Sequence, residues 1–215
     1  MFSGIVHAFC QVHSLTTENN PVRLVIELGE LVTHLEAGQS VAINGVCLTA
    51  VAIENSTVSF EVVDQTLRTT NLGELTTADW INVERSLKLG DEIGGHLLSG
   101  HIAGLALVNS VTSQNEQTRL EVQIPINWRR FLFPKGFIAL NGVSLTLAEY
   151  SRQTGLGLVY LIPETLRRTN LGLARVGTSL NLEIDSQTQT IISTVENYLQ
   201  NSGVSNLPIN NEVDS

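Results

Sequence analysis

The chain has 215 residues, of which 42% are hydrophobic and 15% charged, and its formal net charge is −9. This charge opposes binding to nucleic acid or to an anionic membrane surface, because the 12 lysines and arginines are scattered, and no apolar run approaches the roughly 20 residues of a membrane helix. The N-terminus lacks the basic and apolar regions of an export signal, and Cys10 and Cys47 form no CxxC pair, so we expect a cytoplasmic protein with free thiols and no structural zinc.

The first half of the chain predicts a module built of strands. Residues 40–49 (SVAINGVCLT) and 58–63 (VSFEVV) are short apolar runs rich in β-branched residues. Asn44-Gly45 predicts a tight hairpin turn, because both central residues of such a turn need a positive φ. Several strands of this size, followed by residues 66–73 (TLRTTNLG), favour a small Greek-key barrel that leaves no sheet edge exposed.

The second half repeats the first. Residues 137–146 (FIALNGVSLT) match the SVAINGVCLT segment at six of ten positions, and residues 165–172 (TLRRTNLG) match the TLRTTNLG segment at seven of eight. Self-similarity on this scale indicates a tandem duplication. We therefore predict an all-β chain of two tandem similar Greek-key β-barrels, at residues 1–96 and 97–185.

After Asp185 the hydrophobic period changes to that of an amphipathic helix, which we predict over residues 186–200. Ser186 and Gln189 have the spacing of a capping box at its start. The helix either packs against its own barrel or associates with other copies of the chain. Residues 201–215 are polar and predict a disordered tail. The apolar stripe of the helix consists of Ile191, Ile192, Val195, Tyr198 and Leu199.

Differences between the two copies mark candidate functional positions. Cys47 is either a buried small hydrophobic residue or a nucleophile, and no charge beside it in the sequence favours a thiolate. His101 is either a satisfied core residue or a general base near neutral pH. Asp185 precedes the helix, so it is either a cap or a catalytic group. The matched pairs that differ are Cys47 with Ser144, Ile5 with His101, Gln65 with Glu164, Ser40 with Phe137, and Ser86 with Asp185.

Other polar residues are the same in both copies. Hydroxyl and amide groups at equivalent places suit a neutral, polar, ring-bearing ligand better than a phosphate. Gly94-Gly95 belongs to no strand-to-helix phosphate loop, and His96 with His101 lacks the further ligands of a zinc site. The residues alone therefore predict a binder of polar small molecules with two sites. The shared residues are Thr49 and Thr146, Thr66 and Thr165, and Asn71 and Asn170.

Seven segments along the chain form a recognisable series. They are residues 1–6 (MFSGIV), 44–49 (NGVCLT), 94–102 (GGHLLSGHI), 135–137 (KGF), 141–146 (NGVSLT), 162–166 (IPETL) and 183–185 (EID). In this order, and over nearly the whole chain, they resemble the riboflavin synthase family. Several separate matches are far more specific than one short motif.

The resemblance implies the dismutation of two molecules of 6,7-dimethyl-8-ribityllumazine. One molecule donates a four-carbon unit to the other, which yields riboflavin and 5-amino-6-(D-ribitylamino)uracil, and no cofactor or metal is needed. It also implies a homotrimer in which the paired barrels come from neighbouring subunits. Two stacked reactants in one cleft gain much of their rate from proximity.

The same resemblance implies catalytic roles for five side chains. The carbanion of the lumazine C7 methyl group delocalises into the ring, so a modest base such as His101 suffices to help remove its proton. Ser40, Cys47, Ser144 and Asp185 are expected to activate or deliver a nucleophile, or to orient the second molecule.

Substrate contacts carry over from the family in two groups. The group expected in the first barrel is Gly4, Ile5, Val6, Cys47, Leu48, Thr49, Glu61, Val62, Val63, Asp64, Gln65 and Thr66. The group expected in the second is Gly100, His101, Ile102, Lys135, Ser144, Leu145, Thr146, Tyr160, Leu161, Ile162, Pro163, Glu164 and Thr165. Ser3 and Gln65 stand where the family usually has Thr and Glu, and Gln65 is given no proton-transfer role because an amide does not ionise.

Two other classes of protein share parts of this pattern. A non-catalytic protein that binds lumazine or flavin is expected to have lost the polar residues of one copy, whereas both copies keep them here. A purely structural β-domain protein leaves the divergent Cys47, His101 and Asp185 unexplained. Formation of riboflavin from the lumazine separates the three classes.

Overall fold

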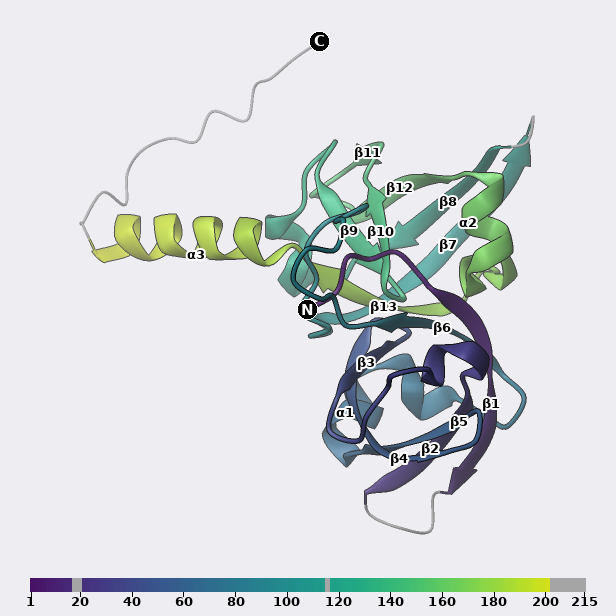
Figure 1. Ribbon diagram of the computed structural model, residues 1–215. Helices are drawn as coiled ribbons and strands as arrows, with labels where there is room; N and C mark the ends of the chain where they lie inside the picture. Colours follow the sequence, from purple (N-terminus) through teal and green to yellow (C-terminus); the bar gives the residue numbers. More distant parts are fainter. Residues whose placement is uncertain (17–20, 115–116, 202–215) are drawn as a thin grey trace.

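Two barrels of antiparallel strands and a projecting C-terminal helix make up the molecule (Figure 1). The computed structural model describes residues 1–16, 21–114 and 117–201. The predicted fold, two similar Greek-key barrels followed by an amphipathic helix, is confirmed. Within those ranges, the structure contains no helix long and apolar enough to span a membrane.

The first barrel closes from six strands in the order β1-β2-β5-β4-β3-β6. In β2, Val22, Leu24 and Ile26 are buried and alternate with exposed or half-buried residues, so one face of the strand enters the core. The strands are β1 (Ala8–Thr16), β2 (Val22–Glu27), β3 (Ser40–Ile43), β4 (Val46–Glu54), β5 (Thr57–Val62) and β6 (Trp80–Arg85). The short helices η1 (Gly29–Val32), α1 (Asp64–Thr69) and η2 (Asn71–Glu74) connect them.

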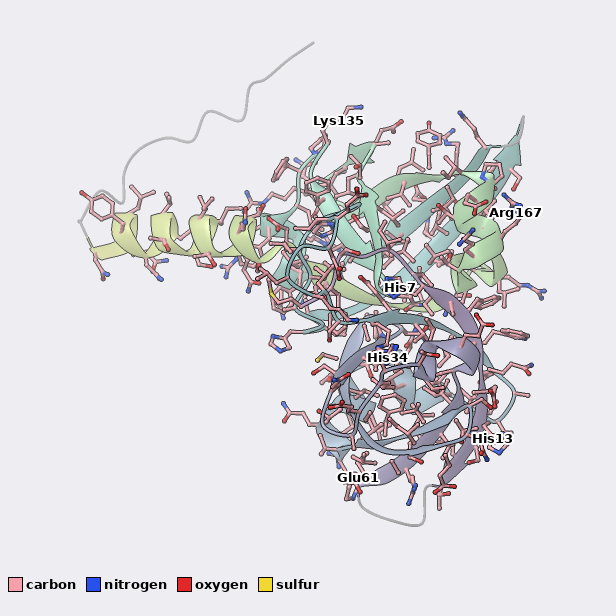
Figure 2. All side chains as sticks on the ribbon, viewed as in Figure 1. His7, His13, His34, Glu61, Lys135 and Arg167 are labelled. Carbon is pink, nitrogen blue, oxygen red and sulfur yellow. The ribbon has the colours of Figure 1, made fainter. Side chains whose placement is uncertain are left out.

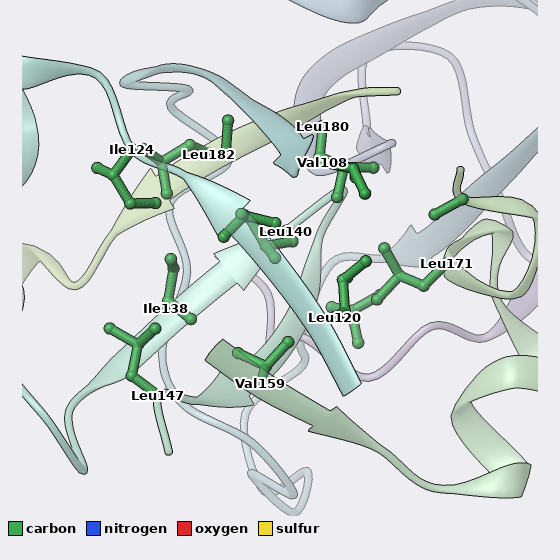
Figure 3. Close-up of a cluster of buried hydrophobic side chains, with 14 of the residues drawn as sticks. Val108, Leu120, Ile124, Ile138, Leu140, Leu147, Val159, Leu171, Leu180 and Leu182 are labelled. Atoms are coloured by element: carbon green, nitrogen blue, oxygen red, sulfur yellow. The ribbon is translucent and has the colours of Figure 1, made fainter. Parts of the chain in front are cut away.

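The second barrel is a seven-stranded sheet in the order β10-β9-β13-β7-β8-β12-β11. β10 and β11 stand at opposite ends of this order although only residues 147–148 separate them, so the sheet wraps round on itself. Leu120, Ile138 and Leu140 lie in its core and are fully buried (Figure 3). The strands are β7 (Gly104–Gln114), β8 (Gln117–Gln123), β9 (Phe137–Leu140), β10 (Val143–Thr146), β11 (Glu149–Tyr150), β12 (Leu156–Leu161) and β13 (Ser179–Ile184). The short helices are η3 (Ile126–Phe131), α2 (Pro163–Arg168) and η4 (Asn170–Leu173).

The two Asn-Gly pairs form the predicted tight turns and meet between the barrels. Asn44 and Gly45 have φ values of 46° and 80°, and Asn141 and Gly142 have values of 47° and 76°. A Cβ atom on Gly45 would lie 2.6 Å from the backbone nitrogen of Gly142, and one on Gly142 would lie 2.8 Å from Cα of Gly45. The prediction of tight turns is confirmed, and glycine is required there both for the conformation and for the contact.

Asparagine side chains join the two barrels around these turns. The backbone nitrogen of Asn71 donates to Oδ1 of Asn181 at 2.7 Å, and that of Asn170 donates to Oδ1 of Asn82 at 2.7 Å. The side-chain amides of Asn82 and Asn181 each donate to a backbone carbonyl of the other barrel at 2.9 Å. Each contact thus has a counterpart with the two copies exchanged, so the interface has approximate twofold symmetry. The six residues involved are Asn44, Asn71, Asn82, Asn141, Asn170 and Asn181.

The C-terminal helix α3 (Ser186–Asn201) is capped by Asp185. Oδ2 of Asp185 accepts hydrogen bonds from the backbone nitrogen and Oγ1 of Thr188, at 2.8 and 2.6 Å. The capping role that the sequence offers for Asp185 is therefore confirmed, and the predicted capping box of Ser186 and Gln189 is wrong, because the N-cap lies one residue earlier. A carboxylate there satisfies a free amide and also interacts favourably with the helix dipole.

The apolar stripe of α3 is largely uncovered. The helix projects away from both barrels (Figure 1), and Ile191, Val195 and Tyr198 are 63%, 51% and 70% exposed. Ile192 is the partly buried member of the stripe, and it packs against the core of the second barrel. Packing against its own barrel therefore accounts for only one part of the helix. Of the predicted tail, residue 201 ends α3 and residues 202–215 lie outside the described residues.

Candidate functional site

The segments that lead into the two barrels exchange places. Gly4 precedes β1 but lies against the second barrel, where the backbone nitrogen of Ser144 donates to its carbonyl at 2.8 Å. Gly100 precedes β7 but lies against the first barrel, where the backbone nitrogen of Cys47 donates to its carbonyl at 3.0 Å. The segments cross at Phe2 and Leu98, whose backbones pair with each other. Each barrel is completed by the segment that leads into the other.

The two crossings have nearly the same geometry. Gly4 and Gly100 have φ values of +75° and +78°. A Cβ atom on Gly4 would lie 2.5 Å from Cβ of Ser144, and one on Gly100 would lie 2.5 Å from Cβ of Cys47. The two crossings are therefore equivalent sites, except that Gly4 lies against the hydroxyl-bearing Ser144 and Gly100 lies against the thiol-bearing Cys47.

Two buried carboxylates hold the crossing segments. Oε1 of Glu84 accepts from the backbone nitrogen and Oγ of Ser3 at 2.6 and 2.8 Å, and Oε1 of Glu183 accepts from the same two groups of Ser99 at 2.7 and 2.8 Å. Each carboxylate also accepts from the amide of the following glycine. Burial raises the pKa of both carboxyl groups above the usual value, and these hydrogen bonds act in the opposite direction.

A cavity of about 180 Å³ opens beside Ser144. Its wall combines apolar side chains with hydroxyls and with Glu164, which is paired with Arg167 and Arg168. Such a mixture suits a ring-bearing ligand that also offers several polar groups. The lining residues are Gly4, Ile5, Val6, Val143, Ser144, Ile162, Glu164, Thr165, Arg168 and Thr169.

Comparison with known proteins gives matches to both barrels. The lumazine binding domain family matches residues 3–86 and again 99–185. The riboflavin synthase of Escherichia coli (strain K12) is 44% identical over 202 residues, which are 93% of each chain. That of Chlamydia pneumoniae is 42% identical over 204 residues, which are 94% of this chain and 99% of the relative. The chain belongs to the riboflavin synthase family.

Solved structures of related fold contain bound ligands. LumP complexed with riboflavin superposes with a TM-score of 0.79 at 27% identity, covering 86% of this chain and all of LumP. LumP complexed with 6,7-dimethyl-8-(1'-D-ribityl) lumazine gives a TM-score of 0.77 at 26% identity, with the same coverage. The likeness extends over both barrels.

The segment exchange corrects the expected division of family binding residues between the barrels. Gly4, Ile5 and Val6 are expected in the first barrel, but they line the cavity of the second, and Val6 is part of the second core. Residues 100–102 are expected in the second barrel, but Gly100 lies on Cys47 and Ile102 packs against the first core. The repeat offset alone does not reveal this exchange, because it is the same whichever barrel a segment covers.

The five candidate catalytic residues are distributed over the two barrels. Ser40 in β3, Cys47 in β4 and the exposed His101 belong to the first barrel. Ser144 in β10 and Asp185 after β13 belong to the second. Ser144 is the member of this set that lines the 180 Å³ cavity.

Cys47 and Ser40 have further contacts near the crossing. The Cys47 thiol is free and half-buried, and it packs against a small apolar cluster that includes Phe2 and Leu98. The carbonyl of Ser40 accepts a hydrogen bond from Oγ of Ser86 at 2.7 Å. Cys47 thus lies beside an exchanging segment, whereas Ser40 contacts the residue that follows β6.

The remaining expected substrate contacts differ in accessibility. Leu48, Val62 and Leu161 are buried in the barrel cores, so their side chains are not available to a ligand. Glu61 and Lys135 are exposed and lie at opposite ends of the molecule (Figure 2). Exposed or half-buried members at the rims and first helical turns are Thr49, Val63, Asp64, Gln65, Thr66, Leu145, Thr146, Tyr160, Ile162, Pro163, Glu164 and Thr165.

Two expected ligand amides serve the interface instead. The side-chain nitrogen of Asn71 donates to Oδ1 of Asn141, and that of Asn170 donates to Oδ1 of Asn44, each at 2.9 Å. In the described part of the chain, no group of three His, Cys, Asp or Glu side chains is placed to hold a metal ion.

Three buried residues near the site escape prediction from the sequence. Glu84 and Glu183 occupy equivalent positions of the repeat, and this equivalence is the feature of the sequence that could have indicated their shared role. The sequence suggests for His96 only a pairing with His101, whereas in the structure its ring contacts Ser144.

Proposed function

We propose that the chain catalyses the dismutation of two molecules of 6,7-dimethyl-8-ribityllumazine to riboflavin and 5-amino-6-(D-ribitylamino)uracil by transfer of a four-carbon unit. The observation that carries this proposal is the pair of equivalent crossings at Ser144 and Cys47. A reaction between two identical molecules needs two similar sites, and its two molecules play different roles, so the groups facing them differ. The riboflavin synthases at 42% and 44% identity support the same reaction.

Each barrel is proposed to bind one molecule through the groups around its crossing. In the first, these include Cys47, Thr49 and the segment 100–102; in the second, they include Ser144 and the segment 4–6. His101 is proposed to help remove the C7 methyl proton of one lumazine, because its imidazole is exposed and an imidazole nitrogen can accept a proton. Ser40 and Asp185 are proposed to orient the second molecule or to deliver a nucleophile.

The working form is proposed to be a homotrimer in which barrels of neighbouring subunits face each other. The exposed stripe of α3 supports this, since an uncovered apolar helix face favours association. The lining of the cavity beside Ser144 also supports it, because it includes no residue of β1–β6. A second lumazine held by a neighbouring subunit would complete the reaction site.

The enzyme is proposed to act in the cytoplasm, where reducing conditions keep Cys10 and Cys47 as thiols. The test of function is to mix the purified chain with the lumazine alone and to follow riboflavin by absorbance. One riboflavin is expected for every two lumazines consumed. Binding of the lumazine without riboflavin formation would instead support the non-catalytic alternative.

Dialysis against a chelator supplies the control for metal independence. Turnover is expected to be unchanged, because the proposed chemistry uses no metal. A loss of turnover that one added metal restores would contradict this part of the proposal.

A further inference from the structure

His96 lies at the end of the segment between the barrels and faces the candidate site. It is 6% exposed, and its Nδ1 is 2.7 Å from Oγ of Ser144. Its ring stacks on Phe137, with centroids 4.8 Å apart and an angle of 12° between the planes. A Cβ atom on the preceding Gly95 would lie 2.6 Å from Cβ of Ser144, so glycine allows the segment to pass this close. The ring is held against the Ser144 hydroxyl by contacts on several sides.

The second nitrogen of this ring has no partner. Nε2 of His96 is buried and makes no hydrogen bond within the described residues. A buried polar atom without a partner destabilises a fold, and a phenyl ring would fill the same place without that penalty. The hydrogen bond between Nδ1 and Oγ of Ser144 is therefore what an imidazole provides here and a phenyl ring would not.

The surroundings of His96 favour the neutral imidazole. Burial lowers the pKa of His96 below its usual value of 6.5, and the carboxylate of Asp185 acts more weakly in the opposite direction. Ser144 and Phe137, which contact the ring from β10 and β9, carry no charge. A neutral imidazole has one nitrogen that accepts a hydrogen bond and one that donates.

We propose that His96 is a positioning residue for Ser144, with Nδ1 accepting the hydroxyl proton so that the lone pairs of Oγ face the cavity. Ser144 then accepts a hydrogen bond from an N–H or O–H of the ligand. A protonated His96 would donate to Oγ instead and would turn the hydroxyl proton away from the ring. The ligand is a lumazine or flavin, a statement that rests on the proposed function.

The tautomer can be measured without any ligand. Nitrogen NMR of ¹⁵N-histidine-labelled full-length protein near pH 7.5 is expected to show His96 neutral and protonated at Nε2. The signal is assigned by its loss in His96→Phe. A ring protonated at Nδ1, or a charged ring at this pH, would overturn the proposal.

A double-mutant cycle tests the coupling to ligand binding. Riboflavin is the probe, because as the reaction product it is not consumed. Ser144→Ala and His96→Phe are each expected to weaken one binding site by about 5- to 10-fold, the usual range for one hydrogen bond. The double variant should be no weaker than either single variant, because both remove the same bond. Multiplying effects would contradict the assignment.

Further variants separate positioning from packing. His96→Asn keeps an acceptor near Ser144 and should restore most of the affinity lost in His96→Phe. Affinity of the unchanged protein should fall as the pH drops through the folded-state pKa of His96, whereas His96→Phe should show no such step. His13→Phe, the same change at an exposed position of β1, is the matched control. Equal losses in the Asn and Phe variants would assign His96 a packing role and defeat the proposal.

These tests can be interpreted even if the proposed reaction is wrong. The tautomer needs no ligand, and the cycle needs only riboflavin binding. If the chain bound riboflavin but formed none from the lumazine, the proposed function would fail while the His96 assignment stood. If the chain formed riboflavin normally but the effects of the two substitutions on affinity multiplied, the proposed function would stand and the His96 assignment would fail.

Discussion

Gly45 and Gly142 touch across the approximate twofold axis between the barrels, each in a turn with positive φ. Gly45→Ala would add a Cβ atom 2.6 Å from the backbone nitrogen of Gly142. We expect a loss of roughly 2–4 kcal/mol in the free energy of unfolding, from backbone strain and steric overlap together. Denaturant unfolding followed by circular dichroism measures it.

Gly38→Ala is the matched control for Gly45→Ala. Gly38 has a φ of +92°, and a Cβ atom there would meet nothing within 4 Å. Its substitution should lower the free energy of unfolding only through backbone strain, by about 1–2 kcal/mol. Equal losses in the two variants would show that contact between the turns contributes little.

The anchors Glu84 and Glu183 give the protein a specific pH dependence. Because burial raises their pKa in the folded state, their contribution to stability is fully present below the unfolded value of about 4.3 and is lost as the pH rises through the folded value. Thermal unfolding of Glu84→Gln and Glu183→Gln, measured from pH 4 to 8, should show a shallower decline than the unchanged protein. The difference is at most about 1.4 kcal/mol per pH unit for each group.

Glu61→Gln controls for the loss of a carboxylate as such, since Glu61 is exposed. Its pH profile of stability should follow that of the unchanged protein. If the Glu84 and Glu183 variants also followed it, the two anchors would have nearly the same pKa in the folded and unfolded states.

The helix α3 should hold the oligomer together. Truncation at Ser186 or the single change Val195→Lys is expected to lower the mass seen by sedimentation velocity and to reduce turnover at least 10-fold, because the facing barrel is lost. Circular dichroism should show both barrels still folded. Asn197→Lys adds the same charge to the helix outside the stripe and should leave the mass unchanged. An unaltered mass after truncation would remove α3 from the interface.

The segment exchange predicts which site each variant affects. His101 precedes β7 but lies by the first barrel, whereas Ser144 is in the second. His101→Ala and Ser144→Ala should therefore weaken different sites in a riboflavin titration, and their effects should be independent in the double variant. If both variants changed the same site, the two sites would not divide as the segments do.

Local patterns in the sequence predict most of the fold. The Asn44-Gly45 and Asn141-Gly142 turns follow from the φ values that the turn requires, and α3 follows from its hydrophobic period. The repeat identifies two similar barrels because equivalent residues form equivalent strands. These features depend on neighbours in the chain, so the chain order is sufficient to find them.

What the sequence could not give depends on contacts between distant residues. Whether Gly4 covers Cys47 or Ser144 is decided by the path of the chain between the barrels. Asn71 is a polar repeated residue by pattern, and only the structure shows that it faces Asn181 rather than a ligand. For α3, the sequence offers both Asp185 and Ser186 as N-cap residues, and only the hydrogen bonds of the structure assign the cap to Asp185.

The exchange of segments also bears on how the duplicated chain arose. A single-copy ancestor with this geometry would lack the piece that completes its own barrel and would obtain it from a second molecule, as a domain-swapped homodimer. Fusion of two copies turns that encounter into an intramolecular one at high effective concentration, without any new contact. Once joined, the two partners no longer have to be identical. Cys47 and Ser144 can then diverge in one molecule while the scaffold around them stays the same.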